Sequence, residues 1–94
     1  MNELLKQILE RIGTGNYGVT VHAAEMIYER GLEDWQVVGL TLEGKFISSH
    51  PTATPRPKVE IRLTLPDGTA AKAVWSYDRI LDRALLVTVH FFDR

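Results

Sequence analysis

The hydrophobic pattern at the start of the chain has the spacing of an amphipathic helix. Apolar residues recur at positions i, i+1, i+4, i+5 and i+8 between charged and amide side chains: Leu4, Leu5, Ile8, Leu9 and Ile12. This spacing places the apolar side chains on one stripe of a helix. Glycines at positions 13, 15 and 18 interrupt the pattern, so we predict that this helix ends near Gly13 and that a loop follows.

Two further helices are predicted before residue 45. Thr20 is suited to be the N-cap of a helix that begins near His22. Arg30-Gly31 is suited to end it, because arginine favours the negative end of a helix dipole and glycine adopts the left-handed terminating conformation. Acidic residues at 33 and 34 precede apolar residues at near-helical spacing, which predicts a third helix that ends by Gly44.

After Gly44 the hydrophobic period changes from helical to alternating. The clearest example is 59–65, where apolar side chains alternate strictly with Glu60, Arg62 and Thr64. Pro66-Asp67-Gly68 has the composition of a tight turn and predicts a hairpin. The proline-rich segment 50–57 is predicted to be an ordered surface loop. Four strands are predicted: 45–49, 59–65, 70–77 and 85–92.

Helices precede strands, so the pattern predicts an α+β fold. We expect two or three N-terminal helices packed on one face of a roughly four-stranded antiparallel sheet. The 94 residues suffice for one hydrophobic core, which predicts a single domain over residues 1–94.

The last predicted strand has apolar residues on both sides. Leu86 and Phe92 have the opposite parity to Leu85, Val87 and Phe91. Either helices cover the second face or a partner does, and a homodimer is the inference we draw from this pattern.

Composition excludes several classes of site. Cysteine is absent, which removes disulfides, thiolate catalysis and cysteine-based metal sites. No apolar run approaches the roughly 20 residues that cross a bilayer, so we expect a cytoplasmic protein without membrane contact. The three histidines, His22, His50 and His90, are not spaced as a metal motif. We therefore predict no cofactor and no metal.

Charge is unevenly distributed along the chain. The net charge is −1, but residues 1–35 carry three basic and six acidic side chains, whereas residues 36–94 carry eight basic and six acidic ones. Arg62, with Arg56, Lys58 and Lys72 expected nearby, could hold a phosphate. The alternative is an ordinary solvated strand face whose charges pair across strands with Glu60 and others.

Two histidines are candidates for acid–base chemistry, because imidazole exchanges protons near neutral pH. His22 begins a predicted helix and could face a cleft. His90 lies between Val89 and Phe91 in a strand, where a packed or peripheral histidine is the more common situation.

The motif His22-Ala23, then Arg30-Gly31-Leu32 and the acidic helix start Glu33-Asp34, resembles a bacterial family. Together with a strand that ends in Leu86-Val87-Thr88-Val89, it is similar over residues 17–92 to the domain of unknown function 4258 family. That family is similar in arrangement to small toxin ribonucleases of the RelE and BrnT kind. One position departs from the pattern, since Met26 stands where such sequences often have arginine.

The resemblance implies a site of His22 and Arg30, to which the strand pattern adds Arg62. If the chain cuts RNA, we expect metal-independent chemistry in which His22 removes the ribose 2′-hydroxyl proton while Arg30 or Arg62 stabilises charge on the phosphate.

Two functions therefore follow from the sequence. The first is a non-catalytic domain that acts through a homo-oligomer or a small protein partner, with an antitoxin as one candidate. The alternative is a toxin-like endoribonuclease or a degenerate relative of one, with RNA as partner.

Overall fold

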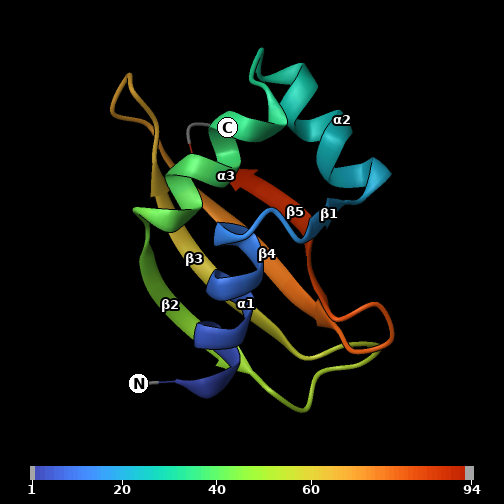
Figure 1. Cartoon of the computed structure of the whole chain (residues 1–94). Helices are drawn as coiled ribbons and strands as arrows, with labels where there is room; N and C mark the ends of the chain where they lie inside the picture. Colours follow the sequence, from blue (N-terminus) through green and yellow to red (C-terminus); the bar gives the residue numbers. More distant parts are fainter. Residues whose placement is uncertain (1, 93–94) are drawn as a thin grey trace.

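The computed structural model describes residues 2–92 and has an α+β fold, as the sequence predicted (Figure 1). Its described residues form three helices and a five-stranded sheet with strand order β1-β5-β4-β3-β2. The single-domain prediction covers residues 1–94, of which 1, 93 and 94 lie outside the described part. The elements are α1 (Glu3–Gly13), β1 (Tyr17–Val19), α2 (Val21–Glu29), α3 (Asp34–Leu42), β2 (Lys45–His50), β3 (Lys58–Thr64), β4 (Ala70–Asp78) and β5 (Arg83–Phe91).

The predicted signals at both ends of α2 are confirmed. The Thr20 hydroxyl accepts a hydrogen bond from the backbone N–H of Ala23 at 3.1 Å, which satisfies one of the free donors of the first turn. Arg30 is the C-cap, and Gly31 follows with φ +78°. A side chain at Gly31 would be strained in this left-handed conformation, so the glycine ends the helix and turns the chain toward α3.

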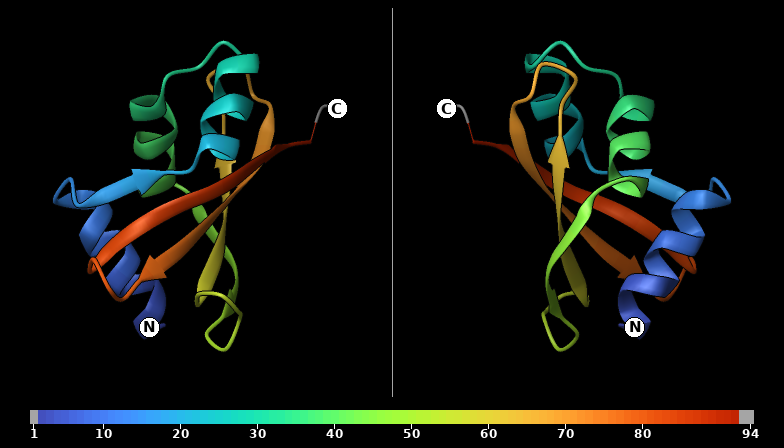
Figure 2. Two further views of the ribbon diagram at one scale, coloured as in Figure 1. Left: turned by 90° about the vertical axis from the view of Figure 1, so that its right-hand side faces the viewer. Right: turned by 90° about the vertical axis from the view of Figure 1, so that its left-hand side faces the viewer.

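One face of the sheet is covered by α1 and α3, as Figure 2 shows. Alternate residues of β3 and β4 point into this layer and are fully buried, among them Val59, Ile61 and Trp75. The Trp75 indole N–H donates to the Thr41 hydroxyl of α3 at 3.2 Å. The other face of β2–β5, which we call the open face, is not covered by α1 or α3.

The first strand was not predicted. Tyr17–Val19 pairs in parallel with residues 84–86 of β5, so the sheet is mixed and not wholly antiparallel. Thr20 continues this pairing: its N–H donates to the carbonyl of Leu86 at 3.0 Å and its hydroxyl to that of Val87 at 2.9 Å. Three residues with glycine at the centre carry too little periodicity to reveal a strand. The tertiary contact with β5 creates it.

A bulge explains part of the predicted two-sided apolar character of the last strand. The register between β4 and β5 shifts at the step from Val74 to Trp75, so that Val87 is left out of the pairing. A bulge of this kind changes the parity of every later side chain. Leu86 and Phe91 therefore both point into the helix-covered core, while Thr88 and His90 point to the open face. Leu85 is nonetheless buried on the side opposite to Leu86, so the strand keeps apolar residues on both sides and the homodimer inferred from them stays a prediction.

Beyond β1, the free edge of β5 is occupied by α2, which packs against β5 and α3. This arrangement brings the first turn of α2 beside Thr88. The fold thus places one helix at the border between the helical layer and the open face.

Candidate nucleic-acid interface

Four basic or titratable side chains lie in register across four strands of the open face. Lys45 of β2 is directly opposite Arg62 of β3, Arg62 is opposite Lys72 of β4, and Lys72 is opposite His90 of β5. We call these residues the basic row. Directly opposite residues share one face of a sheet, and like charges in such positions are destabilising. The basic row therefore costs stability and adds nothing to the core.

A second row runs beside the basic row and contains its main acidic neighbour. It consists of Ser48, Glu60, Val74 and Thr88. The Ser48 hydroxyl donates to Glu60 Oε1 at 2.7 Å, and Lys72 Nζ lies 3.5 Å from Glu60 Oε2. The hydrogen bond from Ser48, followed by the charge of Lys72, lowers the pKa of the Glu60 carboxyl, which partial burial opposes. Glu60 thus remains ionised and offsets one cation.

The other cations of the basic row stay available to solvent. Lys45 and Arg62 are exposed, and no ion pair between described residues includes either of them. Lys58, which pairs with His50 and Ser76 one step further along the strands, adds another cation to the same face. The explanation that these strand charges neutralise one another thus applies to Lys72 and not to Arg62.

His22 lies at the border of the open face, at the start of α2. Its Nε2 is 3.1 Å from Thr88 Oγ1, whose hydroxyl donates to Met26 Sδ at 3.4 Å. Thr88 and His90 are two residues apart on one strand and project to the same face. The His22 ring thus contacts the Thr88 hydroxyl, whereas the His90 ring packs edge-on against Phe92 with ring centres 5.2 Å apart, and both imidazoles are exposed.

Arg30 contacts β5 on the side opposite to the open face. Its guanidinium carbon is 4.9 Å from the centre of the Phe91 ring and one of its nitrogens is 3.9 Å from Asp67 Oδ2. Phe91 points into the core, so Arg30 covers the core and holds the 66–68 turn against α2. Among the residues predicted as catalytic, the structure brings His22 and Arg62 to the open face and leaves Arg30 away from it.

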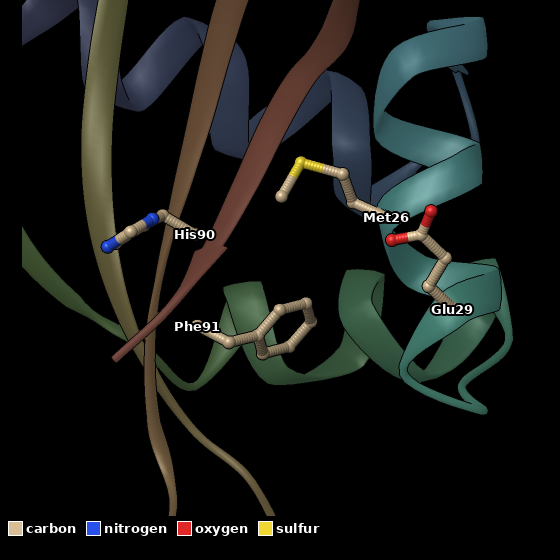
Figure 3. A pocket seen from close by; sticks show the side chains of 4 residues that line it. All are labelled: Met26, Glu29, His90 and Phe91. Atoms are coloured by element: carbon tan, nitrogen blue, oxygen red, sulfur yellow. The ribbon is translucent and has the colours of Figure 1, made fainter. Parts of the chain in front are cut away.

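The hollow beside His90 is small. Met26, Glu29, His90 and Phe91 line a cavity of about 90 Å³ where α2 meets the edge of β5 (Figure 3). In Figure 3, Met26 and Glu29 come from α2, while His90 and Phe91 project to opposite sides of β5. Pockets for small organic ligands usually enclose about 300–1,000 Å³. This hollow is too small to enclose such a ligand, so a ligand of the open face would have to extend across its surface.

Lys45 and the in-register pairing of the basic row could not be predicted from the sequence. Lys72 was expected near Arg62, and this prediction is confirmed by their direct pairing. The contribution of Lys45 depends on the irregular register of β2 between Phe46 and Ser48, and that of His90 depends on the bulge at Val87. Neither irregularity has a marker in the sequence.

Among the described residues, no three histidine, aspartate or glutamate side chains gather as ligands for a metal ion. None of the described helices combines the length and the apolar character that crossing a bilayer requires.

Comparison with known proteins identifies one relationship. No curated protein and no solved structure matches the chain, so the likeness to RelE and BrnT toxins stays a prediction. The profile of one family, described as "Domain of unknown function (DUF4258)", matches residues 19–90. This range covers most of the chain and runs from the end of β1 to His90. It confirms the resemblance stated from the His22 and Arg30 motifs: the chain belongs to the DUF4258 family.

Proposed function

We propose that the open face binds the phosphate backbone of RNA. The observation that carries this proposal is the basic row, in which the cations Lys45, Arg62 and Lys72 lie side by side at an electrostatic cost and His90 continues the row. A bound polyanion would turn this repulsion into attraction, because each cation near a phosphate releases condensed counterions. Arginine also offers a rigid donor fork that matches phosphate oxygens.

The dimensions of the basic row favour an extended polyanion over a single anion. Adjacent strands are about 4.8 Å apart, so four strands span roughly 14 Å. A nucleic-acid strand carries one phosphate charge per nucleotide, so a row of this length can contact more than one phosphate of an extended strand. The resemblance to toxin ribonucleases supports RNA as the polyanion.

The test compares two variants of equal charge. Arg62→Gln combined with Lys72→Gln removes the centre of the basic row. Arg56→Gln combined with Arg79→Gln removes two exposed cations in the loops outside it. We expect the first variant to bind labelled single-stranded RNA about 30-fold more weakly and to lower the slope of log affinity against log salt by about 1.4, since each contact contributes about 0.7.

Fluorescence anisotropy at several salt concentrations measures both quantities, and thermal unfolding checks that both variants are folded. If the loop variant loses as much affinity as the row variant, the binding reflects net charge alone. That result, or no binding by the unmodified protein at low salt, contradicts the proposal.

A second candidate function, RNA cleavage, is favoured by two exposed imidazoles: that of His22, which contacts Thr88, and that of His90, two residues further along β5. In this proposal one histidine removes the 2′-hydroxyl proton, and the 2′-oxygen attacks the adjacent phosphorus. The other histidine protonates the leaving 5′-oxygen, which yields a 2′,3′-cyclic phosphate and a 5′-hydroxyl end. Arg62 would stabilise the phosphate charge; Arg30, which lies over Phe91, would not take part.

Cleavage is tested with His22→Ala and His90→Ala, and His50→Ala serves as the matched control. We expect either of the first two to reduce cleavage by at least about 100-fold and the control to cleave normally. Equal cleavage by His22→Ala and the unmodified protein, or no cleavage at all, would remove this second candidate and leave the binding proposal intact.

A further inference from the structure

An apolar groove lies between α2 and α3, away from the open face. Its larger part has a volume of about 490 Å³ and a neighbouring part about 280 Å³, and both are lined by Leu32 and Trp35. Ala24, Ile27 and Tyr28 contribute from α2, while Gly39 and Leu40 of α3 and Pro66 of the 66–68 turn extend it. We call this continuous surface the α2–α3 groove.

Large apolar side chains at the α2–α3 groove are left in solvent. Val21 is 76% exposed, Tyr28 84% and Trp35 69%. Trp35 lies outside the core, whose tryptophan is the fully buried Trp75. Exposed aromatic residues clustered beside an apolar hollow are typical of interaction sites, where tyrosine and tryptophan supply much of the binding energy.

The charges around the α2–α3 groove have one sign. Glu25, Glu33 and Asp34 line it, and its lining contains no lysine, arginine or histidine. No ion pair between described residues includes these three acids. A partner seated on the apolar floor would therefore meet a negative edge, which favours a partner with basic flanks.

We propose that the α2–α3 groove binds an amphipathic helix with basic flanks from another protein. Val21 and Tyr28 are seven residues apart on α2, which is about 10.5 Å, and the apolar anchors i and i+7 of a docked helix have the same separation. The groove is formed by helices, whose backbone groups are already paired. It therefore cannot bind a partner by adding a strand.

The chemistry argues against a second copy of this chain as the occupant. The basic surface of this protein is the open face, on which Phe92 is the most exposed large apolar residue described. Docking that face into the α2–α3 groove of another copy would also join unlike surfaces, which generates a ring or an open-ended chain of molecules and not a twofold dimer.

The experiment uses a synthetic peptide as probe and Trp35 as reporter. A peptide of about 16 residues carries leucines at i, i+3 and i+7 with lysines on both flanks, and a matched peptide has glutamate in place of every lysine. We expect only the basic peptide to shift Trp35 emission to shorter wavelength, because the indole leaves water. Buried Trp75 supplies a constant background.

Charge reversal identifies the surface. Glu25→Lys combined with Asp34→Lys should weaken binding of the basic peptide at least 10-fold, whereas Glu3→Lys combined with Glu10→Lys on α1, which changes the net charge equally, should not. Tyr28→Ala, at a position 84% exposed, tests the apolar contact without touching the core and should also weaken binding.

Several outcomes would overturn the proposal. They are no emission shift up to about 1 mM basic peptide, equal binding of the acidic peptide, or unchanged binding by the groove variant. Sedimentation that detects a dimer broken by Tyr28→Ala would assign the groove to a second copy instead. RNA binding by the groove variant, measured in parallel, keeps this proposal separate from the one for the open face.

Discussion

The open face and the α2–α3 groove differ in almost every physical property. The open face presents lysine, arginine and histidine side chains on a sheet, with Glu60 among them and Glu43 lining a hollow beside Lys45 and Arg62. The groove presents aromatic side chains and an apolar hollow, and the charged residues that line it are all acidic. A net charge of −1 thus conceals two surfaces of opposite sign. The comparison teaches that the charge of a small domain says little about its partners until the fold separates the charges in space.

The two surfaces also differ in how the chain builds them. The larger part of the α2–α3 groove comes from one continuous stretch, residues 21–35. The basic row combines residues 45, 62, 72 and 90, which only strand pairing brings together. A change at the junction between the helices and the sheet should therefore disturb both surfaces. A change within one layer should disturb only the surface that this layer carries.

The largest expected effect is that of Gly44→Ala, because Gly44 joins α3 to β2 and so links both surfaces. A Cβ at this position would lie 2.6 Å from Ile61 Cγ2 and 2.7 Å from the backbone oxygen of Arg62. The backbone cannot yield as a flexible side chain would, so we expect a loss of about 3 kcal/mol in unfolding free energy. Chemical denaturation measures this loss.

Gly39→Ala is the matched control, since a Cβ there meets nothing within 4 Å. Alanine is the better helix former in the body of α3, so the control should gain roughly 0.5–1 kcal/mol. Equal stability of Gly44→Ala and the unmodified protein would show that the α3–β2 junction adapts freely.

The next effect in size is that of Thr41→Val, which changes the layer beneath the groove and leaves the open face untouched. The Thr41 hydroxyl donates to the Val37 carbonyl at 2.8 Å and accepts from Trp75 Nε1 at 3.2 Å. Valine has the same shape but leaves the buried indole N–H without an acceptor, which should cost about 2 kcal/mol.

Thr41→Ser keeps the hydroxyl and should cost less than valine does. Denaturation followed by Trp75 fluorescence distinguishes the two variants, and RNA affinity should be the same in both at temperatures where they are folded. A serine variant less stable than the valine variant would mean that methyl packing outweighs the hydrogen bond.

The smallest expected effect concerns Glu60, the acid whose negative charge offsets that of Lys72 in the basic row. Its folded-state pKa is lowered, so the carboxylate contributes stability above the unfolded pKa and loses it as the pH falls through the folded value. Ser48→Ala removes the hydrogen bond that lowers this pKa most, so the Glu60 pKa should rise toward its ordinary value.

Side-chain carbon NMR across a pH titration measures this change. Ser49→Ala on the same strand should leave the Glu60 titration unaltered, because Ser49 pairs with Val59 and lies on the other face. An unchanged Glu60 pKa in Ser48→Ala would mean that the remaining interactions, chiefly with Lys72, keep the carboxylate ionised.

Several elements could be predicted because their signals are local. The N-cap Thr20, the C-cap sequence Arg30-Gly31 and the alternation from Val59 to Leu65 all act through neighbours in the chain. The family motif lies in the same local region. The predicted site was only partly assembled: His22 and Arg62 reach the open face, whereas Arg30 packs on Phe91. The roles assigned to all three stay predictions.

By itself, the sequence determined the α+β class, the three helices and four of the five strands, because turns, caps and two-residue or helical periods are properties of adjacent residues. Only the tertiary structure decided the strand β1, the bulge at Val87 and the alignment of the basic row. These features arise from hydrogen bonds between segments far apart in the chain, where a shift of one residue moves each side chain to the opposite face.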